Sequence, residues 1–534
     1  MKKFQNVFFF LSIGFISYLP FLNILFLPIA LFSYSYFFKK IYENKDIEDV
    51  FVISMSYSFG YGIFSMFDFF QGAIELRSLG IVKSTIVFIF YSSIFNILFS
   101  LCCVLFKRFF LFKGVVLKSI GFSFFVSYSF LLTDVVNFPV TPNAYMWWQV
   151  PEIYQNLSLL GIYGLTFLTI LFLCTPYIVF SFRNDRKKLI NSSVSFLILF
   201  ISMFFYGKNR IESNTQEIVD EKPVIRIMHT TYNMKNSKKQ FDKYLKNIPL
   251  ENMKKSIKMI VWPESTFRMV MFDSKQIEKR TNPMSHWFSS DLKGFSGIIS
   301  YESSFFQLYD KYKHVQNGIL NKNQVEKRYN SIIFINSEQK VVDMYQKRRL
   351  APIVEYIPFP RMVINIFKYF GFYKKPSIPN LSHGSSDKVL STIDNIGTFI
   401  PLICYESILP LRISYKDIKK SQFILVSSNE EWMLSKLPKW MTHIGSIARS
   451  IELGIPMIRS TNGGVTSVVD SYGRAIKIIN DSDKNEYIDT HIPKSIEGRT
   501  IYSRFDKYIY EIFSIISIII LLPGIIMFFR RRKT

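Results

Sequence analysis

Long apolar runs frame this chain and constrain its fold more than any other feature. Seven precede residue 207 and an eighth lies near the end: Phe8–Leu19, Phe21–Phe38, Val50–Phe70, Ser84–Leu105, Leu111–Leu132, Ile162–Phe182, Ile190–Tyr206 and Tyr508–Phe529. Most approach the ~20 residues that a helix needs to cross a bilayer. The first is short and follows two lysines, as a secretory signal does. Because it continues through Pro20 into the next run without a cleavage site, we interpret it as the first helix of a tight hairpin.

The basic residues favour one orientation of these runs. Lysine and arginine clusters flank both termini and follow the second, fourth and sixth runs, whereas residues 133–161 contain none. Short loops rich in Lys and Arg stay on the cytoplasmic side of a membrane. With eight spans both termini face the same side. We therefore predict that both termini are cytoplasmic and that residues 207–507 lie on the opposite side, which is the periplasm in a cell with two membranes.

Composition supports a membrane protein with a sizeable extramembrane part. The 534 residues are 49% hydrophobic and carry a net charge of +25. The basic residues that flank apolar runs explain this charge, and they also suit anionic lipid head groups. Nucleic-acid binding is the competing interpretation, but the basic residues are not gathered on one compact module. We expect no nucleic-acid partner.

The segment after Lys222 has the sequence pattern of an α/β domain. Short β-rich runs alternate there with polar helical stretches, and a run such as Phe399–Ile403 reads as a strand buried on both faces. A helix is expected at His443–Leu453, where Gly454 ends it. The expected strands are Val224–His229, Lys258–Trp262, Gly297–Tyr301, Ser331–Ile335, Val341–Tyr345, Thr398–Cys404, Phe423–Ser427, Pro456–Arg459 and Ser467–Asp470. We predict an α/β sandwich of about 280 residues.

Three residues at strand ends form a candidate nucleophilic site. Glu264 follows the run ending in Trp262-Pro263, Lys347 follows Tyr345-Gln346, and Cys404 ends an apolar run. Taken singly, they read as a surface carboxylate, one member of a basic run and a buried core cysteine. Together they supply a base, a cation and a thiol, which are the parts of an acyl-transfer site.

Cys404 is also unlike the other cysteines. Cys102, Cys103 and Cys174 lie within apolar runs, where a thiol behaves as a small hydrophobe. Four cysteines are too few for a disulfide scaffold. The six histidines show no metal-ligand spacing, and no HExxH, CxxC, GxxxxGK[ST], GxGxxG or GxSxG motif occurs. We therefore expect no metal and no cofactor.

Taken together, these runs resemble the nitrilase, or carbon–nitrogen hydrolase, superfamily, whose catalytic set is Glu, Lys and Cys in that order. The matching motifs are Trp262-Pro263-Glu264, Tyr345-Gln346-Lys347 and Cys404-Tyr405-Glu406. With membrane spans on both sides, the chain is most similar to the bacterial apolipoprotein N-acyltransferase family. The stretches Tyr329–Ser331, Leu350–Pro358, Asn429–Trp432 and Arg459–Thr466 also resemble that family.

The resemblance implies a membrane bundle of eight transmembrane helices and an extramembrane α/β nitrilase-like αββα sandwich. The expected domains are residues 1–206, the catalytic domain 207–507, and a last helix with a basic tail at 508–534. The implied reaction moves an acyl chain from a glycerophospholipid to the α-amino group of a diacylglyceryl apolipoprotein, through a cysteine thioester. The expected location is the bacterial inner membrane, and we expect a monomer.

The resemblance also assigns roles to single residues. Glu264, Lys347 and Cys404 are the implied catalytic residues. Glu355, Glu406 and Tyr405 would support the site, with Glu355 positioning Lys347 or Glu264. Asn429 and Trp432 would bind substrate, and Tyr405 and Trp432 would line the lipid entry.

Some positions depart from the family pattern. Val354 replaces a small residue, Arg349 stands where histidine is common, and Met433-Leu434 replaces Phe-Gly. These changes put substrate preference in doubt more than reaction type. Three alternatives stay open: a membrane-anchored amidase, a transporter or lipoprotein-binding scaffold, and an inactive paralogue. A transporter would carry ionisable groups at mid-membrane, but Asp68, Glu75 and Asp134 lie near the predicted ends of spans.

Overall fold

The chain divides into two compact units. One comprises Met1–Thr215 with Arg504–Thr534, and the other Gln216–Ser503. The computed structural model describes residues 2–75, 81–138, 140–213, 223–231, 257–264, 270–272, 298–308, 325–338, 340–352, 354–356, 360–369, 381–433, 435–480 and 486–531.

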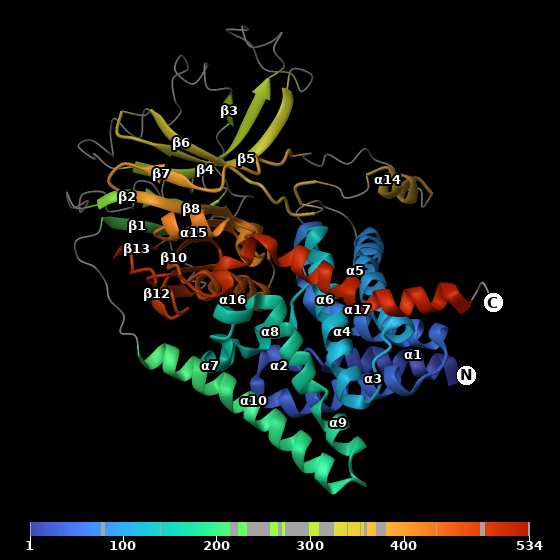
Figure 1. The fold of residues 1–534 in the computed structure, drawn as a ribbon. Coiled ribbons are helices and arrows are strands. Elements are labelled where there is room, and N and C mark those ends of the chain that lie inside the picture. Colours follow the sequence, from blue (N-terminus) through green and yellow to red (C-terminus); the bar gives the residue numbers. More distant parts are fainter. Residues whose placement is uncertain are drawn as a thin grey trace. The chain divides into compact units, whose positions relative to one another are not determined.

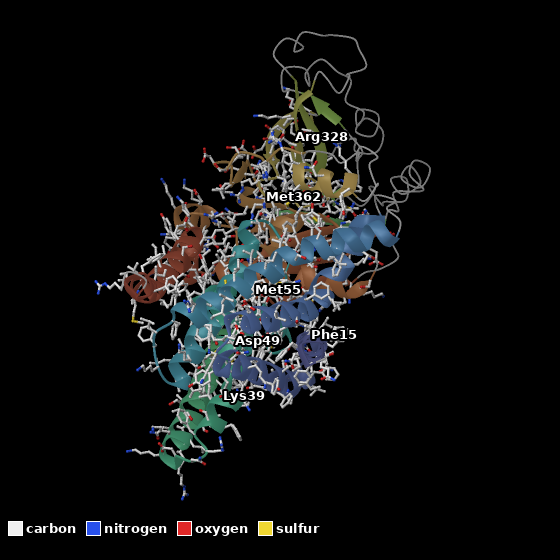
Figure 2. All side chains as sticks on the ribbon, turned by 90° about the vertical axis from the view of Figure 1, so that its right-hand side faces the viewer. Phe15, Lys39, Asp49, Met55, Arg328 and Met362 are labelled. Atoms are coloured by element: carbon white, nitrogen blue, oxygen red, sulfur yellow. The ribbon has the colours of Figure 1, made fainter. Side chains whose placement is uncertain are left out.

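Helices make up the first unit (Figure 1). They are α1 (Lys2–Ile16), α2 (Leu19–Leu22), α3 (Leu27–Glu43), α4 (Ile47–Glu75), α5 (Ile81–Phe109), α6 (Val115–Val135), α7 (Pro151–Tyr154), α8 (Leu157–Leu173), α9 (Thr175–Ser181), α10 (Arg186–Glu212) and α17 (Ile509–Arg531), with short 3₁₀ turns η1 (Ile24–Phe26), η2 (Asn143–Gln149) and η8 (Asp506–Tyr508). Prolines stand in the first turn of α2, α3, α7 and α9, where the missing N–H has no intrahelical partner to lose. Lys39, near the end of α3, and Asp49, near the start of α4, lie on either side of the short connection between these helices and are labelled in Figure 2.

Several of these helices are suited to a membrane. Among the described residues, six are long and apolar enough to cross one, or seven if the bent pair α8 and α9 counts as one span. The helix α4 covers the predicted span Val50–Phe70 without a break. The prediction of eight spans stays a prediction. The short first run is helical, and with α2 it forms one apolar stretch, Gln5–Leu22.

Two sheets form the second unit. The seven-stranded sheet has the order β13-β1-β2-β4-β5-β6, with β3 paired to β4, and the six-stranded sheet has the order β12-β11-β10-β9-β8-β7. The strands are β1 (Val224–His229), β2 (Ile257–Val261), β3 (Val270–Phe272), β4 (Ile298–Leu308), β5 (Val325–Ile335), β6 (Val341–Gln346), β7 (Ser391–Ile393), β8 (Gly397–Ile403), β9 (Ile424–Asn429), β10 (Met457–Asn462), β11 (Val465–Val469), β12 (Ala475–Asn480) and β13 (Glu486–His491). The centre of each sheet is parallel, through β1, β2 and β4 in one and β8, β9 and β10 in the other.

The sheets pack face to face around one apolar core. Inward side chains from both sheets meet there, among them Ile227 and Val261 from one sheet and Leu425 and Ile458 from the other. The same inner faces carry two hydroxyls that bond across the layer. Ser427 Oγ donates to the carbonyl of Trp262 at 3.1 Å, and Ser460 Oγ donates to that of Met228 at 2.6 Å. These bonds add polar ties between the layers at the level of the strand ends.

Helices cover the outer side of the six-stranded sheet. The helix α16 (Lys436–Leu453) packs against β11 and the 3₁₀ turn η6 (Cys404–Ile408), and α15 (Tyr415–Lys420) connects β8 to β9 (Figure 1). A further short helix, α14 (Pro360–Tyr369), follows β6. The expected αββα layering also needs helices on the seven-stranded sheet. The segments between β1 and β2 and most of that between β2 and β4 lie outside the described residues.

The expected elements are present, with several different ends. The helix predicted at His443–Leu453 begins seven residues earlier, at Lys436, because Ser435 takes the extended backbone of a helix N-cap. The strands β4 and β5 are 11 residues each and longer than predicted. Strands β3, β7, β12 and β13 were not predicted, since they are short or outward-facing and lack a continuous apolar run. The strand predicted to end at Cys404 ends at Ile403.

Candidate active site

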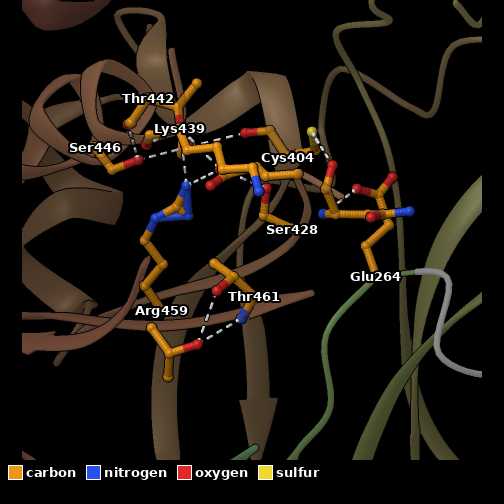
Figure 3. A network of polar contacts seen from close by, with 12 residues as sticks. Glu264, Cys404, Ser428, Lys439, Thr442, Ser446, Arg459 and Thr461 are labelled. Atoms are coloured by element: carbon orange, nitrogen blue, oxygen red, sulfur yellow. Dashed lines mark hydrogen bonds and ion pairs between the residues drawn. The ribbon is translucent and has the colours of Figure 1, made fainter. Parts of the chain in front are cut away.

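The ends of three strands bring the predicted catalytic residues together. Glu264 follows β2 and Lys347 follows β6, both in the seven-stranded sheet, whereas Cys404 follows β8 in the other sheet. The charge of Lys347 acts on both Glu264 and Cys404. Figure 3 shows Glu264 lying beside Cys404. The site therefore lies at one edge of the sandwich, with the base and the cation contributed by one layer and the thiol by the other.

A buried ion pair fixes the lysine. Lys347 Nζ lies 2.9 Å from Glu355 Oε2, and the two side chains are only 2% and 8% exposed. The backbone N–H of Ala351 donates to the same carboxylate oxygen at 2.7 Å. Lys347 is held at its backbone too, because its N–H donates to the carbonyl of Asn330 at 2.8 Å. The ammonium group is thus held in one position, whereas that of an exposed lysine would be mobile in solvent.

Asn330 links the two carboxylates. Its Nδ2 donates to Glu264 Oε1 at 2.9 Å and to Glu355 Oε1 at 3.0 Å. Sequence reasoning noted the Tyr329-Asn330-Ser331 run but gave Asn330 no role. Its position on β5, directly beside the lysine strand β6, is a consequence of antiparallel pairing that the sequence pattern did not reveal. The amide keeps two negative groups apart and aligned on one cation.

The last residue of β9, Asn429, contacts both the base and the nucleophile. The backbone N–H of Asn429 donates to Glu264 Oε2 at 2.9 Å. The carbonyl of Asn429 accepts a bond from Trp432 Nε1 at 2.8 Å and lies 4.0 Å from Cys404 Sγ. Both residues had been predicted to bind substrate. In the structure Asn429 acts on the site through its backbone, and Trp432 braces that backbone.

Glu406 ties the lysine segment to the cysteine segment. Its carboxylate is 3% exposed and accepts bonds from the backbone N–H groups of Arg348 at 2.8 Å and Ile403 at 3.0 Å. The Tyr345 hydroxyl donates to both of its oxygens. Removing this carboxylate would leave several buried donors without partners. Tyr405, predicted to support the site and line the lipid entry, is buried and packs with Ala351 and Leu409.

Cys404 itself has a backbone conformation that few side chains adopt. Its φ is +48°, in the left-handed region, which costs energy for a residue with a Cβ. The Ser407 hydroxyl donates to the Cys404 carbonyl at 2.8 Å, and Ser446 on α16 is 2.8 Å from Ser407. The chain turns sharply here from β8 into η6. The thiol is therefore presented by a strained corner between a strand and a helical turn, on a residue that is half-buried overall.

Burial dominates the electrostatics of the site. It raises the pKa of Glu264, and Glu355 adds to this effect while Lys347 opposes it. It raises the pKa of Cys404 to about 12, with Glu264 adding to the rise and Lys347 again opposing it. Burial alone would lower the pKa of Lys347, but the surrounding negative groups, Glu355 first, raise it. At neutral pH the site therefore holds an ammonium group, a protonated thiol and an unusually basic carboxylate.

The residues that depart from the family pattern surround this site. Arg349 donates its backbone N–H to Glu406 at 3.0 Å and its guanidinium to the carbonyl of Pro410 at 3.3 Å. Val354 packs against the cluster of Tyr405, and Met433 is buried. Leu434 lies outside the described residues. Among the residues that are described, no three His, Cys, Asp or Glu side chains are arranged to hold a metal ion.

Comparisons with known proteins found a matching family, similar relatives and similar solved structures. The family described as carbon-nitrogen hydrolase matches residues 236–499. An apolipoprotein N-acyltransferase of Agrobacterium fabrum is 25% identical over 76% of this chain and 72% of its own length. Another, of Rickettsia bellii, is 26% identical over 93% of both chains. Among solved structures, a nitrilase-superfamily amidase of Nesterenkonia covers 54% of this chain and 96% of its own, at 14% identity and a TM-score of 0.33.

A two-sheet sandwich with a glutamate, a lysine and a cysteine at one edge defines a carbon–nitrogen hydrolase domain. Here that domain is joined to helices suited to a membrane, and the similarity to the Rickettsia bellii relative extends over 93% of the chain. The chain is similar to apolipoprotein N-acyltransferases over most of its length, and about half of it matches the carbon-nitrogen hydrolase family. It is accordingly an acyltransferase.

Proposed function

We propose that this enzyme transfers a fatty acyl chain from a glycerophospholipid to the α-amino group of the N-terminal S-diacylglyceryl-cysteine of apolipoproteins. One observation carries the proposal: a buried lysine, held by Glu355, faces both a basic carboxylate and a thiol. This set suits two successive acyl transfers, first to sulfur and then to nitrogen. The relatives carry the name of this activity.

In the first half-reaction Cys404 is the nucleophile. Its sulfur attacks the ester carbonyl of the phospholipid while Glu264 takes the thiol proton. Lys347 stabilises the oxyanion that develops, a contribution of roughly 10²–10³ in rate for one such donor. The C–O bond then breaks, the proton passes from Glu264 to the departing oxygen, and lysophospholipid leaves. Cys404 is left as a thioester.

In the second half-reaction the lipoprotein amine attacks the thioester. Glu264 accepts a proton from the amine, the C–S bond breaks, and the proton returns to the Cys404 sulfur. The products are an amide and the free enzyme. Amine attack must outpace hydrolysis, which requires that water be kept from the thioester. An amidase would differ only here, because water would be its second acceptor.

The proposed location follows from the charge pattern of the apolar runs. Clusters of Lys and Arg favour cytoplasmic termini and a periplasmic catalytic domain, residues 207–507. Both proposed substrates are anchored in the bilayer by acyl chains. An enzyme with its own membrane helices keeps its site within reach of them, so that no acyl chain has to cross water.

The test uses the full-length protein in detergent with a phospholipid that carries a labelled acyl chain and no acceptor. We expect label on Cys404 that hydroxylamine releases, and transfer of that label to the amine of an added diacylated lipopeptide. Cys404→Ala should abolish labelling, whereas the matched variant Cys174→Ala should retain it. Release of free fatty acid without amide product would favour the amidase. Absence of label in folded protein with several phospholipids would overturn the proposal.

A further inference from the structure

Another buried carboxylate directly follows Asn429, whose carbonyl lies 4.0 Å from the thiol, and it has no role in the reaction as proposed. Glu430 is 1% exposed and follows Asn429 in the turn after β9. Its Oε1 accepts bonds from Arg459 Nη2, from Thr442 Oγ1 at 2.8 Å and from Ser428 Oγ at 3.1 Å. Figure 3 shows the Arg459 guanidinium reaching from its strand towards Thr442. The cluster is thus a buried ion pair braced by two hydroxyls.

This cluster lies on the outer side of the six-stranded sheet. Arg459 is on β10, where it pairs in register with Val426 on β9, so Ser428 and Glu430 follow on the same face. Thr442 is on α16, the helix that covers this face. The ion pair therefore joins a strand, a turn and a helix. A buried pair that loses one member leaves the other charge uncompensated, so the three elements are held in one arrangement.

The turn held in this way contacts the catalytic residues. Asn429, directly before Glu430, gives its N–H to Glu264 at 2.9 Å, and its carbonyl lies 4.0 Å from Cys404 Sγ. Ser428, directly before Asn429, has its hydroxyl on Glu430 and also acts on the thiol. A shift of this turn would move the hydrogen-bond partner of the base and the surroundings of the nucleophile together.

We infer that Glu430, clamped by Arg459 and Thr442, is a positioning residue for Cys404. It fixes the turn that orients Glu264, and it places a second negative charge beside the thiol. The inference rests on the acyl transfer proposed at Cys404. No step of that reaction passes through Glu430, because its Oε1 is occupied by three donors and its Oε2 is buried against Gly464.

The charges around the thiol support this role. Glu264 and Glu430 both raise the pKa of Cys404, after burial, whereas Lys347 and the Ser428 hydroxyl lower it. On α16, burial and then the charge of Arg459 lower the pKa of His443 to about 3, so this ring is neutral at working pH. Arg459 is therefore the cation that faces Glu430 from the sheet, and His443 adds no charge.

The consequence is a thiol that stays protonated until an ester arrives. Two carboxylates disfavour a standing thiolate, and Glu264 removes the proton only as sulfur begins to bond to carbon. A thiolate is also the form that oxidants attack, so a protonated resting thiol resists oxidation. This protection matters for an unpaired cysteine on the oxidising side of a membrane.

The test is the pH profile of Cys404 alkylation by iodoacetamide, followed by peptide mass spectrometry on the full-length enzyme in detergent. Glu430→Gln keeps the size of the side chain and removes its charge. We expect the midpoint of alkylation to fall by about one pH unit, as for loss of a like charge nearby. We also expect acylation of Cys404 to slow by about tenfold or more, because the turn loses its clamp. Glu497→Gln, at an exposed position of the same unit, should leave both unchanged.

Two further variants separate charge from position. Glu430→Asp keeps the negative charge but moves it away from Arg459 and Thr442, because the side chain is one methylene shorter. Acylation should therefore slow while the alkylation midpoint changes little. Glu430→Gln combined with Arg459→Gln leaves no unpaired charge, and it replaces Glu430→Gln if that variant fails to fold. In the double variant the midpoint should return towards that of the unmodified enzyme, with acylation still slow. A folded Glu430→Gln or double variant with the acylation rate of the unmodified enzyme would overturn the inference. The proposed function fails separately, if the unmodified enzyme forms no acyl-enzyme.

Discussion

The two units bury different kinds of polar group. Among the described residues, the bundle unit buries hydroxyls and amides, and its only buried charged side chains are Asp134 and Asp506. Many of its hydroxyls bond to a carbonyl three or four residues earlier in the same helix, as Ser100 and Thr169 do. The catalytic unit instead buries full charges, which lie in pairs such as Lys347 with Glu355 and Arg459 with Glu430.

This difference follows from the solvent that each unit faces. A helix in a bilayer satisfies its backbone internally, and a charge there is expensive, so neutral groups serve for local contacts. In the catalytic unit, burial strengthens the electrostatic interactions on which proton transfer and oxyanion binding depend. In the catalytic unit, the same buried charges therefore affect both folding stability and chemistry. In the bundle unit, the buried polar groups affect mainly stability. Four changes test how far the separation goes.

The largest effect is expected from Glu355→Gln. Lys347 would lose its ion-pair partner while still buried, and such losses cost about 3–5 kcal/mol of folding free energy. Acyl-enzyme formation should fall by about 10²–10³, because the lysine proposed to stabilise the oxyanion is no longer held. Labelling of Cys404 and thermal unfolding in detergent measure the two effects. The exposed pair Lys340–Glu338, at 3.0 Å, gives the control: Glu338→Gln should change neither.

The pH dependence of acylation should report Glu264. As the proposed base this carboxylate must be ionised, and burial raises its pKa. The rate should therefore fall about tenfold per unit as pH drops below that raised pKa, with a midpoint above the ~4.3 of an ordinary glutamate. Asn330→Ala removes a hydrogen-bond donor that lowers the pKa of Glu264. The acidic limb of the pH–rate profile should therefore move to higher pH in this variant. If the acidic limb of the profile stays at the same pH in Asn330→Ala, a group other than Glu264 controls it.

A smaller effect is expected where the bundle does bury a charge. Asp134 on α6 accepts bonds from the hydroxyls of Tyr163, at 2.7 Å, and Tyr510 on α17. Tyr510→Phe should cost about 1 kcal/mol of folding free energy, since one of the two donors remains. Acylation of the folded protein should not change. Tyr508→Phe, at an exposed position, is the matched control for unfolding in detergent.

The smallest effect is expected from a neutral contact inside the bundle. Ser17 Oγ lies 2.8 Å from the Tyr57 hydroxyl and 2.7 Å from Ser33 Oγ. Interhelical hydrogen bonds of this kind average about 0.6 kcal/mol in membrane proteins. Ser17→Ala should therefore shift unfolding only slightly. A loss as large as that of Glu355→Gln would show that the bundle depends on polar contacts as strongly as the catalytic unit does.

Sequence patterns predicted the fold well where a run is apolar throughout. Central strands such as β8 and β9 are buried on both faces. A continuous apolar run in the sequence predicts each of them. Strand β12 was not predicted. Most of its side chains are exposed, so its sequence shows no regular alternation of apolar and polar residues. The start of α16 and the end of β8 were misplaced for a related reason. A cap or a corner depends on backbone geometry that the side-chain pattern does not encode.

The site divides in the same way. Glu264, Lys347 and Cys404 were predictable because each follows an apolar strand and each matches a motif. Asn330, Glu430 and Arg459 were given no role, because a buried amide or ion pair is recognisable only when its partner is known. Those partners come from other strands: Asn330 meets Glu264 across 66 positions of sequence, and Arg459 meets Glu430 across 29. Pairing of that length is a property of topology.

The contact between Asp134 and Tyr510 also bears on how the protein is made. Tyr510 lies 376 positions after Asp134, with the entire catalytic unit between them in sequence. A ribosome therefore completes the catalytic unit before it makes the helix that carries Tyr510. Until then Asp134 must remain in the growing bundle with one of its two tyrosine donors absent. This contact therefore waits for α17, and newly made chains pass through a stage in which the catalytic unit has been synthesised while Asp134 still lacks its Tyr510 donor.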